Sequence, residues 1–185
     1  RVQMRTDILK LQRKLGLTTI FVTHDQEEAN TISDRMAVLD KGIIQQIGSP
    51  MNLYDSPVNT FVAHFLGTTN MIEGEVVSID GKTFFRAGDG LEIPVDAPAD
   101  ERHGNIVFRP QTVLINPDNE IQSAVHLKGS IQSLEFLGST VRYHIKVGEV
   151  TVLADVDHYR GKRVYDEKEG VVLVIPEKQV LFVNA

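Results

Sequence analysis

No cysteine occurs among the 185 residues of this chain. The sequence therefore excludes a disulfide framework and a thiolate metal site, and it fits a reducing compartment. No segment approaches the ~18 to 20 consecutive apolar residues that a helix needs to cross a bilayer. The polar amino terminus has no signal-peptide pattern. These absences predict a chain that neither spans a membrane nor carries a secretion signal.

A clustered basic face is also missing. Only Arg160, Lys162 and Arg163 lie close together in the sequence, whereas proteins that follow phosphate backbones usually gather lysine and arginine on one face. Residues 1–66 hold 7 basic and 7 acidic side chains, and residues 67–185 hold 12 and 18, so the whole formal charge of −6 lies in the second part. We therefore expect no nucleic acid among the partners.

The first third of the chain alternates helical and strand patterns. Apolar residues recur at helical spacing between Met4 and Leu15 and predict an amphipathic helix. Residues 18–23 are β-branched or aromatic and predict a buried parallel strand. Asp25 can cap a following helix, with Glu28 three residues later. A buried parallel strand needs neighbours, so we expect either a partner chain or a larger domain to supply them.

A hairpin and two short helices follow. Residues 35–39 and 43–47 flank a turn at Gly42, which predicts the hairpin. Ser49-Pro50 predicts the start of a short helix, and the apolar spacing over residues 58–66 predicts another, which Gly67 ends.

Beyond Gly67 the pattern changes to short strands separated by turn residues. This pattern favours a small barrel of the oligonucleotide/oligosaccharide-binding (OB) type, or two related barrel halves. We therefore predict an α+β chain with one domain over residues 1–67 and a second, all-β domain over residues 68–185. The predicted strands of the second domain are 72–79, 83–86, 91–95, 106–109, 112–115, 125–136, 140–147, 150–155, 171–175 and 180–183.

His24 stands between the predicted strand 18–23 and the helix that Asp25 caps. In open α/β sheets, ligands bind beyond the carboxyl ends of strands, and helix amino termini favour anions. An imidazole there can donate a hydrogen bond to a phosphate oxygen or accept one from water. The alternative is a histidine that ends a strand and bonds a nearby carbonyl.

Two stretches around His24 carry a resemblance to a known family. Residues Thr18–Ala29 resemble the switch-histidine segment of ATP-binding-cassette ATPases, and Asp34–Gly48 is similar to the strand pair after that histidine. The stretch from Ser49 to Gly67 resembles the close of this domain in maltose-type and polyamine-type importers. The resemblance implies that residues 1–67 are the end of a P-loop α/β nucleotide-binding domain and that His24 contacts the γ-phosphate of ATP.

The resemblance extends into the second domain. Phe108-Arg109-Pro110-Gln111 lies where the subgroup has Arg-Pro-Glu, and Leu134–Gly138 and Ile175–Phe182 are similar to later landmarks. The resemblance implies the small regulatory TOBE barrel, with Arg109 and the loop around Gly138 as candidates for a regulatory or dimer surface. For Arg109, the alternative is a rigid strand exit with an exposed arginine, because Pro110 restrains the backbone whatever the site does.

The phosphate-cradling Gly-x-x-x-x-Gly-Lys-[Ser/Thr] loop, the magnesium-binding Asp-Glu strand end and the family's signature segment are all missing from this sequence. We therefore expect this chain alone to be inactive and to bind no cofactor. The resemblance implies that the intact subunit is an ATPase that uses ATP and Mg²⁺. It also implies a second copy, membrane permease subunits and, indirectly, a solute-binding protein as partners, at the cytoplasmic face of the cell membrane.

Two alternatives to a transport ATPase remain open. Residues 71–185 could form a stand-alone module that binds a small ligand, and the acidic charge favours a cationic ligand over an anion. A self-contained hydrolase is the other alternative. The six histidines show no metal-ligand spacing, so we predict no metal site. Gly67–Glu75 looks closer to polyamine, iron or phosphonate importers than to sugar importers.

Overall fold

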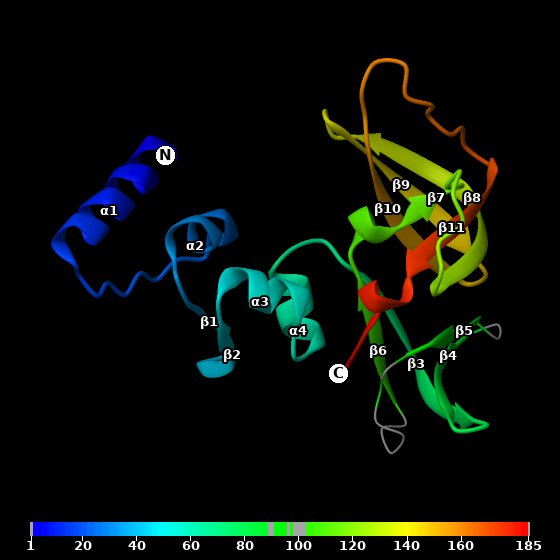
Figure 1. Ribbon diagram of the computed structural model, residues 1–185, viewed down its shortest axis with the longest axis horizontal. Helices are drawn as coiled ribbons and strands as arrows, with labels where there is room; N and C mark the ends of the chain where they lie inside the picture. Colours follow the sequence, from blue (N-terminus) through cyan, green and yellow to red (C-terminus); the bar gives the residue numbers. More distant parts are fainter. Residues whose placement is uncertain (1, 89–90, 96, 98–102, 185) are drawn as a thin grey trace. The chain divides into compact units, whose positions relative to one another are not determined.

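The computed structural model describes residues 2–88, 91–95, 97 and 103–184, apart from the side chains of residues 2, 3 and 5. The chain divides into two compact units, Arg1–Gly67 and Thr68–Ala185. The division falls where the sequence pattern changes from helical to strand spacing. Figure 1 shows that the helices lie mainly in the first unit and the long strands in the second.

The first unit contains four helices and one hairpin in its described part. They follow in the order α1 (Val2–Leu15), α2 (Gln26–Ile32), β1 (Met36–Asp40), β2 (Ile43–Gly48), α3 (Pro50–Asp55) and α4 (Thr60–Phe65). Side-chain oxygens cap three of the helices: Asp25 accepts from Glu28 N, Ser49 from Asn52 N, and Asn59 from Val62 N. Such caps satisfy amide groups that have no partner within the helix.

A small core holds the hairpin to α3 and α4. It consists of the buried side chains of Val38, Leu53, Val62 and Leu66. Helix α1 keeps an apolar stripe in solvent, with Met4, Leu11 and Leu15 more than half exposed. The predicted helix over residues 4–15 is confirmed, but the described residues leave much of its apolar face exposed.

The predicted buried strand at residues 18–23 is wrong for this structure. These residues form no helix or strand, and Ile20 and Val22 are 90% and 92% exposed. A parallel strand is stabilised by hydrogen bonds to neighbours and by cover on both faces. The described residues provide no adjacent strand, so the β-forming side chains alone do not make one.

The described part of the second unit forms two five-stranded antiparallel sheets (Figure 1). The first sheet has the order β12-β6-β3-β4-β5 and the second has the order β10-β9-β8-β11-β7. Their bounds are β3 Asn70–Ile79, β4 Lys82–Ala87, β5 Leu91–Pro94, β6 His103–Phe108, β7 Leu114–Ile115, β8 Ala124–Phe136, β9 Thr140–Val147, β10 Val150–Asp157, β11 Gly170–Pro176 and β12 Leu181–Val183.

One core lies between the strands of both sheets. Phe85 and Ile106 from the first sheet and Tyr143, Ile145 and Leu173 from the second are among its fully buried members. Burial alternates strictly along β9, as a strand with one face in a core requires. This arrangement confirms the predicted all-β, barrel-like character of the region, while the P-loop α/β origin of the first unit stays a prediction.

The predicted strand at residues 112–115 is shorter in the structure. Pro110–Thr112 form a 3₁₀ turn, η1, and only Leu114–Ile115 pair as β7. Thr112 N and Thr112 Oγ1 both donate to Arg109 O. Because Pro110 lacks an amide hydrogen and its ring restrains φ, the chain turns there before it can join a ladder.

Candidate functional site

His24 lies between segment 17–23, which forms no helix or strand, and α2. It is exposed, while Thr23 and Asp25 on either side are partly buried. Asp25 N donates to Thr23 Oγ1 at 3.0 Å, and Thr23 Oγ1 donates to Glu28 Oε2 at 3.0 Å. Glu28 N donates to Asp25 Oδ1 at 3.1 Å. These three bonds restrain the backbone on both sides of His24 and leave its ring in solvent.

Arg109, the second predicted site residue, is buried in the second unit. It is only 9% exposed, and its Nη1 donates to Thr68 O at 3.4 Å. The adjacent strand start is held by Thr69 Oγ1, which donates to Phe108 O at 3.3 Å. The alternative of an exposed arginine at this strand exit is therefore wrong. Burial of a guanidinium is costly unless it is hydrogen-bonded, so this position indicates a structural contact inside the unit.

Gly138, the third predicted site residue, lies in the tight turn between β8 and β9. Its φ is +90°, a conformation that side chains with a Cβ rarely adopt. Leu137 N donates to Thr140 O at 2.8 Å across the turn, and His158 N donates to Ser139 O at 2.8 Å. The turn is therefore fixed from two sides.

Apolar side chains surround this turn at the surface. Phe136 is 64% exposed, Leu137 51% and Tyr159 61%. The Phe136 ring meets the His158 ring edge-on, with 5.3 Å between the ring centroids. The prediction of an interaction surface around Gly138 keeps a physical basis in this patch, since exposed apolar clusters often mark contact sites. His24 belongs to the first unit, whereas Arg109 and Gly138 belong to the second.

A charged row on the second sheet was not predicted from the sequence. Register places Arg142 of β9 between Glu135 of β8 and Asp155 of β10. Arg142 Nε and Nη2 donate to the two oxygens of Asp155 at 2.7 and 2.8 Å. These bonds raise the pKa of Arg142 above its ordinary value, against the effect of burial, and nearby Glu135 adds to the rise. The alternation of side chains along a strand could have predicted that Arg142 lies on the outer face of the sheet. It could not have predicted that Arg142 lies beside Asp155.

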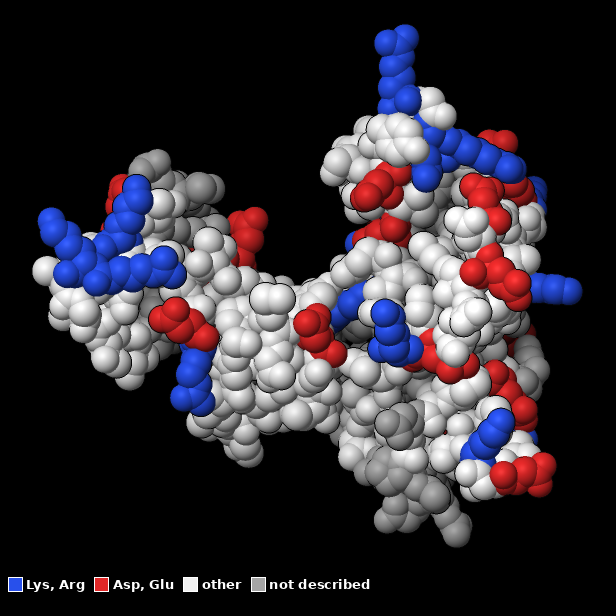
Figure 2. Space-filling model, viewed as in Figure 1, with Lys and Arg blue, Asp and Glu red and all other residues white. Residues whose placement is uncertain are grey.

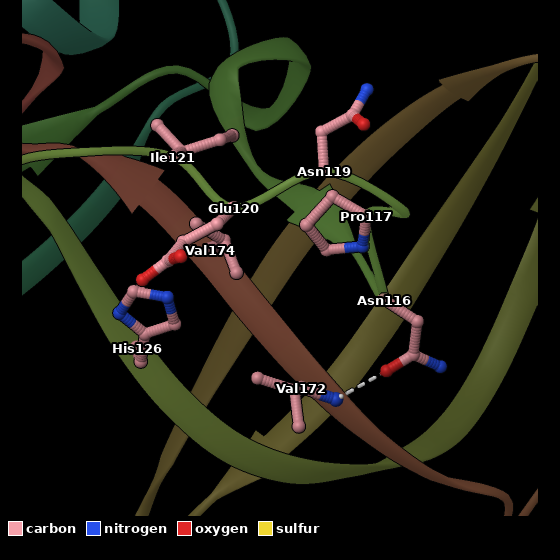
Figure 3. Close-up of a pocket in the computed structure, with 8 residues that line it drawn as sticks. All are labelled: Asn116, Pro117, Asn119, Glu120, Ile121, His126, Val172 and Val174. Atoms are coloured by element: carbon pink, nitrogen blue, oxygen red, sulfur yellow. Dashed lines mark hydrogen bonds between the residues drawn. The ribbon is translucent and has the colours of Figure 1, made fainter.

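A pocket of about 330 Å³ opens beside β11 (Figure 3). Its lining comes from the connection after β7 and from the outer faces of β8 and β11. The lining residues are Asn116, Pro117, Asn119, Glu120, Ile121, His126, Val172 and Val174. The sequence patterns did not indicate this pocket, because it depends on how the connection folds back over the sheet.

Some kinds of site find no support in the described part of the chain. No three histidine, aspartate or glutamate side chains there lie close enough to hold a metal ion together. Within the same residues, every helix is too short or too polar to cross a membrane. On the face of the second unit drawn in Figure 2, basic and acidic side chains are interspersed.

Comparison with known proteins shows what this chain is similar to. A model of the TOBE domain matches residues 106–183. The spermidine/putrescine import ATP-binding protein of Pasteurella multocida is 37% identical over 179 aligned residues, which cover 89% of this chain and 48% of the relative. The Fe(3+) ions import ATP-binding protein of Fusobacterium nucleatum is 40% identical over 154 aligned residues, covering 80% of this chain and 40% of the relative. The chain is homologous to ATP-binding subunits of ATP-binding-cassette importers.

The chain spans less than half the length of both relatives. The first alignment leaves out 11% of the 185 residues, about 20 positions. Among solved structures, a cytoplasmic molybdate-binding protein matches 63% of this chain and 96% of its own, with a TM-score of 0.52 and 13% identity. At that identity the likeness shows the fold only. The sequence comparisons thus show a TOBE domain match and homology to importer ATP-binding subunits, and the solved structure shows a shared fold over 63% of the chain.

Proposed function

We propose that this chain is the carboxyl-terminal part of the ATP-hydrolysing subunit of a solute importer. The observation that carries the proposal is the alignment with an import ATP-binding protein over 89% of the chain. The geometry supports it, since the Thr23, Asp25 and Glu28 bonds hold the His24 backbone while the ring stays exposed. A ring in that position is accessible to a ligand from outside the first unit.

His24 is the residue that we propose acts on the nucleotide. In the complete subunit, paired with a second copy, it contacts the γ-phosphate of ATP and positions the attacking water. This role is one of positioning and electrostatic stabilisation, which dominate phosphoryl transfer. The printed sequence contains no phosphate-cradling loop and no magnesium-binding Asp-Glu pair, so ATP and Mg²⁺ do not fit this chain alone. We therefore expect no ATP hydrolysis by residues 1–185 alone.

The exposed segment before His24 has a role in this proposal. Leu17, Ile20 and Val22 are each at least half exposed, and so are Met4, Leu11 and Leu15 on α1. A buried parallel strand has near-continuous apolar side chains of this kind. We propose that segment 17–23 joins the sheet of the nucleotide-binding domain and that the stripe of α1 packs on it. This arrangement of segment 17–23 and α1 would place His24 at the carboxyl end of a strand.

The second unit has the regulatory role in our proposal. It holds two copies of the subunit together between cycles and receives regulatory signals, with the Gly138 turn at the contact surface and buried Arg109 supporting the strand exit. The further partners are membrane permease subunits and, through them, a solute-binding protein, at the cytoplasmic face of the membrane. The transported solute is not assigned, since relatives of similar identity are named for polyamines and for iron.

A hybrid protein tests the proposal. The corresponding part of the Pasteurella multocida relative is replaced by residues 1–185, and ATP hydrolysis is measured with the permease subunits present. We expect the hybrid to hydrolyse ATP, and we expect His24→Ala to lower the rate about 10²- to 10³-fold, the size typical for a positioned catalytic group. His64→Ala, on α4, serves as the matched control. Equal rates for the His24→Ala and parent hybrids would exclude the role of His24.

A second candidate function is a binding module without catalytic activity, and the pocket beside β11 favours it. The hybrid protein distinguishes the two candidate functions. If the hybrid folds and binds the permease but never hydrolyses ATP, while residues 1–185 bind a small ligand, the module is the better description.

A further inference from the structure

The pocket beside β11 combines an apolar floor with polar groups at its ends (Figure 3). Val174 is only 3% exposed and forms the floor together with Val172, and Pro117 and Ile121 of the connection add apolar side chains to the wall. Figure 3 shows Glu120 and His126 at one end and Asn116 at the other. A pocket of this size and composition suits a short aliphatic chain with a polar head.

Two hydrogen bonds fix the walls of the pocket. Asn116 N donates to Val172 O at 2.8 Å, and Val172 N donates to Asn116 Oδ1 at 2.8 Å. Asn116 therefore extends the β7–β11 ladder by one more residue, through a backbone with φ of +44°. Because its amide oxygen is held by Val172, the Asn116 end of the pocket is preformed. Preformed walls lower the entropic cost of binding a small ligand.

The other end can accept hydrogen bonds. His126 Nδ1 lies 3.1 Å from Ala124 O, so in the neutral ring Nδ1 is the atom that donates. Its Nε2 then carries a lone pair. The Glu120 carboxylate stands on the same side of the pocket (Figure 3) and accepts hydrogen bonds when ionised. Both groups therefore suit a ligand head that donates several hydrogen bonds.

The charge near the pocket favours a cation. Asp118 and Glu120 lie in the connection that forms one wall, and Lys128 of β8 is the basic residue opposite Val172 in the register. Lys128 is exposed, so its ammonium group can extend into water. The two carboxylates outnumber this cation, and the second part of the chain carries the whole negative balance. An anionic head would meet the Glu120 carboxylate directly.

We propose that this pocket binds a primary alkylammonium ion, with the ammonium group at Glu120 and His126 and the aliphatic chain over Val172 and Val174. The class of ligand follows from the pairing of a hydrogen-bond-accepting, negatively charged end with an apolar floor. The site does not depend on ATP or on a second copy of the chain. Its failure would leave the proposed ATPase role intact, and failure of that role would leave this site intact.

Titration of residues 1–185 with butylamine at pH 7 tests the site, with 1-butanol and butyrate as probes of equal length. Two-dimensional amide NMR reports binding at residues 116–121 and 172–174. We expect saturable shifts there with butylamine, at concentrations on the order of millimolar. Butanol should bind more weakly, and butyrate should produce no saturable shift. Equal responses to butylamine and butyrate, or shifts spread over the whole surface, would overturn the proposal.

Glu120→Gln provides the decisive variant, and Asp118→Asn is its control because it removes the same charge two residues away without lining the pocket. We expect Glu120→Gln to weaken butylamine binding about three- to fivefold, as for an exposed ion pair, and Asp118→Asn to weaken it less than twofold. Glu120→Lys should reverse the preference toward butyrate. If the two neutralising variants behave alike, general surface charge and not the pocket explains the binding.

Discussion

Asn70 and Leu153 exchange two hydrogen bonds across 83 residues of sequence. Asn70 Nδ2 donates to Leu153 O at 2.9 Å, and Leu153 N donates to Asn70 Oδ1 at 2.7 Å. Leu153 lies on β10, at an edge of the second sheet, and Asn70 begins β3 of the first sheet. The side-chain amide of Asn70 thus bonds backbone groups of the edge strand β10 in the way that a neighbouring strand would. It also links the two sheets of the second unit.

Replacing Asn70 by alanine should destabilise the second unit. The side chain is 4% exposed, and its removal leaves the Leu153 amide and carbonyl without these partners. We expect a loss of about 2 to 4 kcal/mol in the free energy of unfolding, because each buried group left unpaired costs about 1 to 3 kcal/mol. Urea unfolding followed by circular dichroism measures it. Exposed Asn119→Ala is the control, and equal stability of the two variants would contradict the role of Asn70.

Alkaline pH should weaken the second unit through Tyr143. Burial raises the pKa of this phenol above its ordinary value, although the Tyr165 amide, which donates to its hydroxyl at 3.3 Å, opposes the shift. A pKa raised in the folded state means that the Tyr143 hydroxyl loses its proton more readily in the unfolded chain than in the folded one. The contribution of Tyr143 to stability is therefore complete below the ordinary tyrosine value of about 10 and is lost as pH rises above it.

The measurement for Tyr143 is urea unfolding of the parent chain and of Tyr143→Phe between pH 8 and about 11, the range that spans ordinary tyrosine titration. We expect the parent to lose stability more steeply with pH than the variant above pH ~10. Exposed Tyr159→Phe should keep the parental slope. If the stability of Tyr143→Phe fell with pH as steeply as that of the parent, burial would not control the titration of Tyr143.

Adding a side chain at Gly138 should lower the stability of the second unit, although space for one is available. A Cβ at this position would meet no atom within 4 Å, but φ is +90°. We expect Gly138→Ala to lower the free energy of unfolding by about 1 to 2 kcal/mol, the cost of a side chain in a left-handed backbone. Gly170→Ala is the control, because Gly170 also has an open Cβ position but is not among the positive-φ glycines of the described chain. A neutral Gly138→Ala would refute the strained turn.

The loop that carries His24 depends on Asp25. Asp25→Ala removes the cap on α2 and the bond from Glu28 N. We expect a local loss of about 1 kcal/mol, the usual value of such a cap. Hydrogen exchange of the Glu28 and Ala29 amides should rise about fivefold, and exposed Asp34→Ala should leave these amides unchanged. Unchanged exchange in Asp25→Ala would mean that other contacts hold the loop.

Much of the local structure follows from the sequence for simple physical reasons. The period of two in residues 140–147 identifies β9 because alternate side chains of a strand face the core. Helix α3 starts at Ser49-Pro50 because a hydroxyl caps the first turn and proline fits it. The resemblance around His24 also comes from sequence alone. The burial of Arg109, by contrast, has no local signal, since it depends on Thr68, which lies 41 residues earlier.

What the sequence by itself determined is most of the strands and helices, the change of architecture near Gly67 and the relation to importer ATP-binding subunits. What only the tertiary structure decided is which strands pair, which polar groups meet and where a pocket opens. Residues 18–23 show the difference most clearly, because their side chains favour a strand but their neighbours decide whether one forms. A local propensity is worth about 1 kcal/mol or less, whereas the ladder hydrogen bonds and the burial that stabilise a parallel strand come from contacts with distant segments.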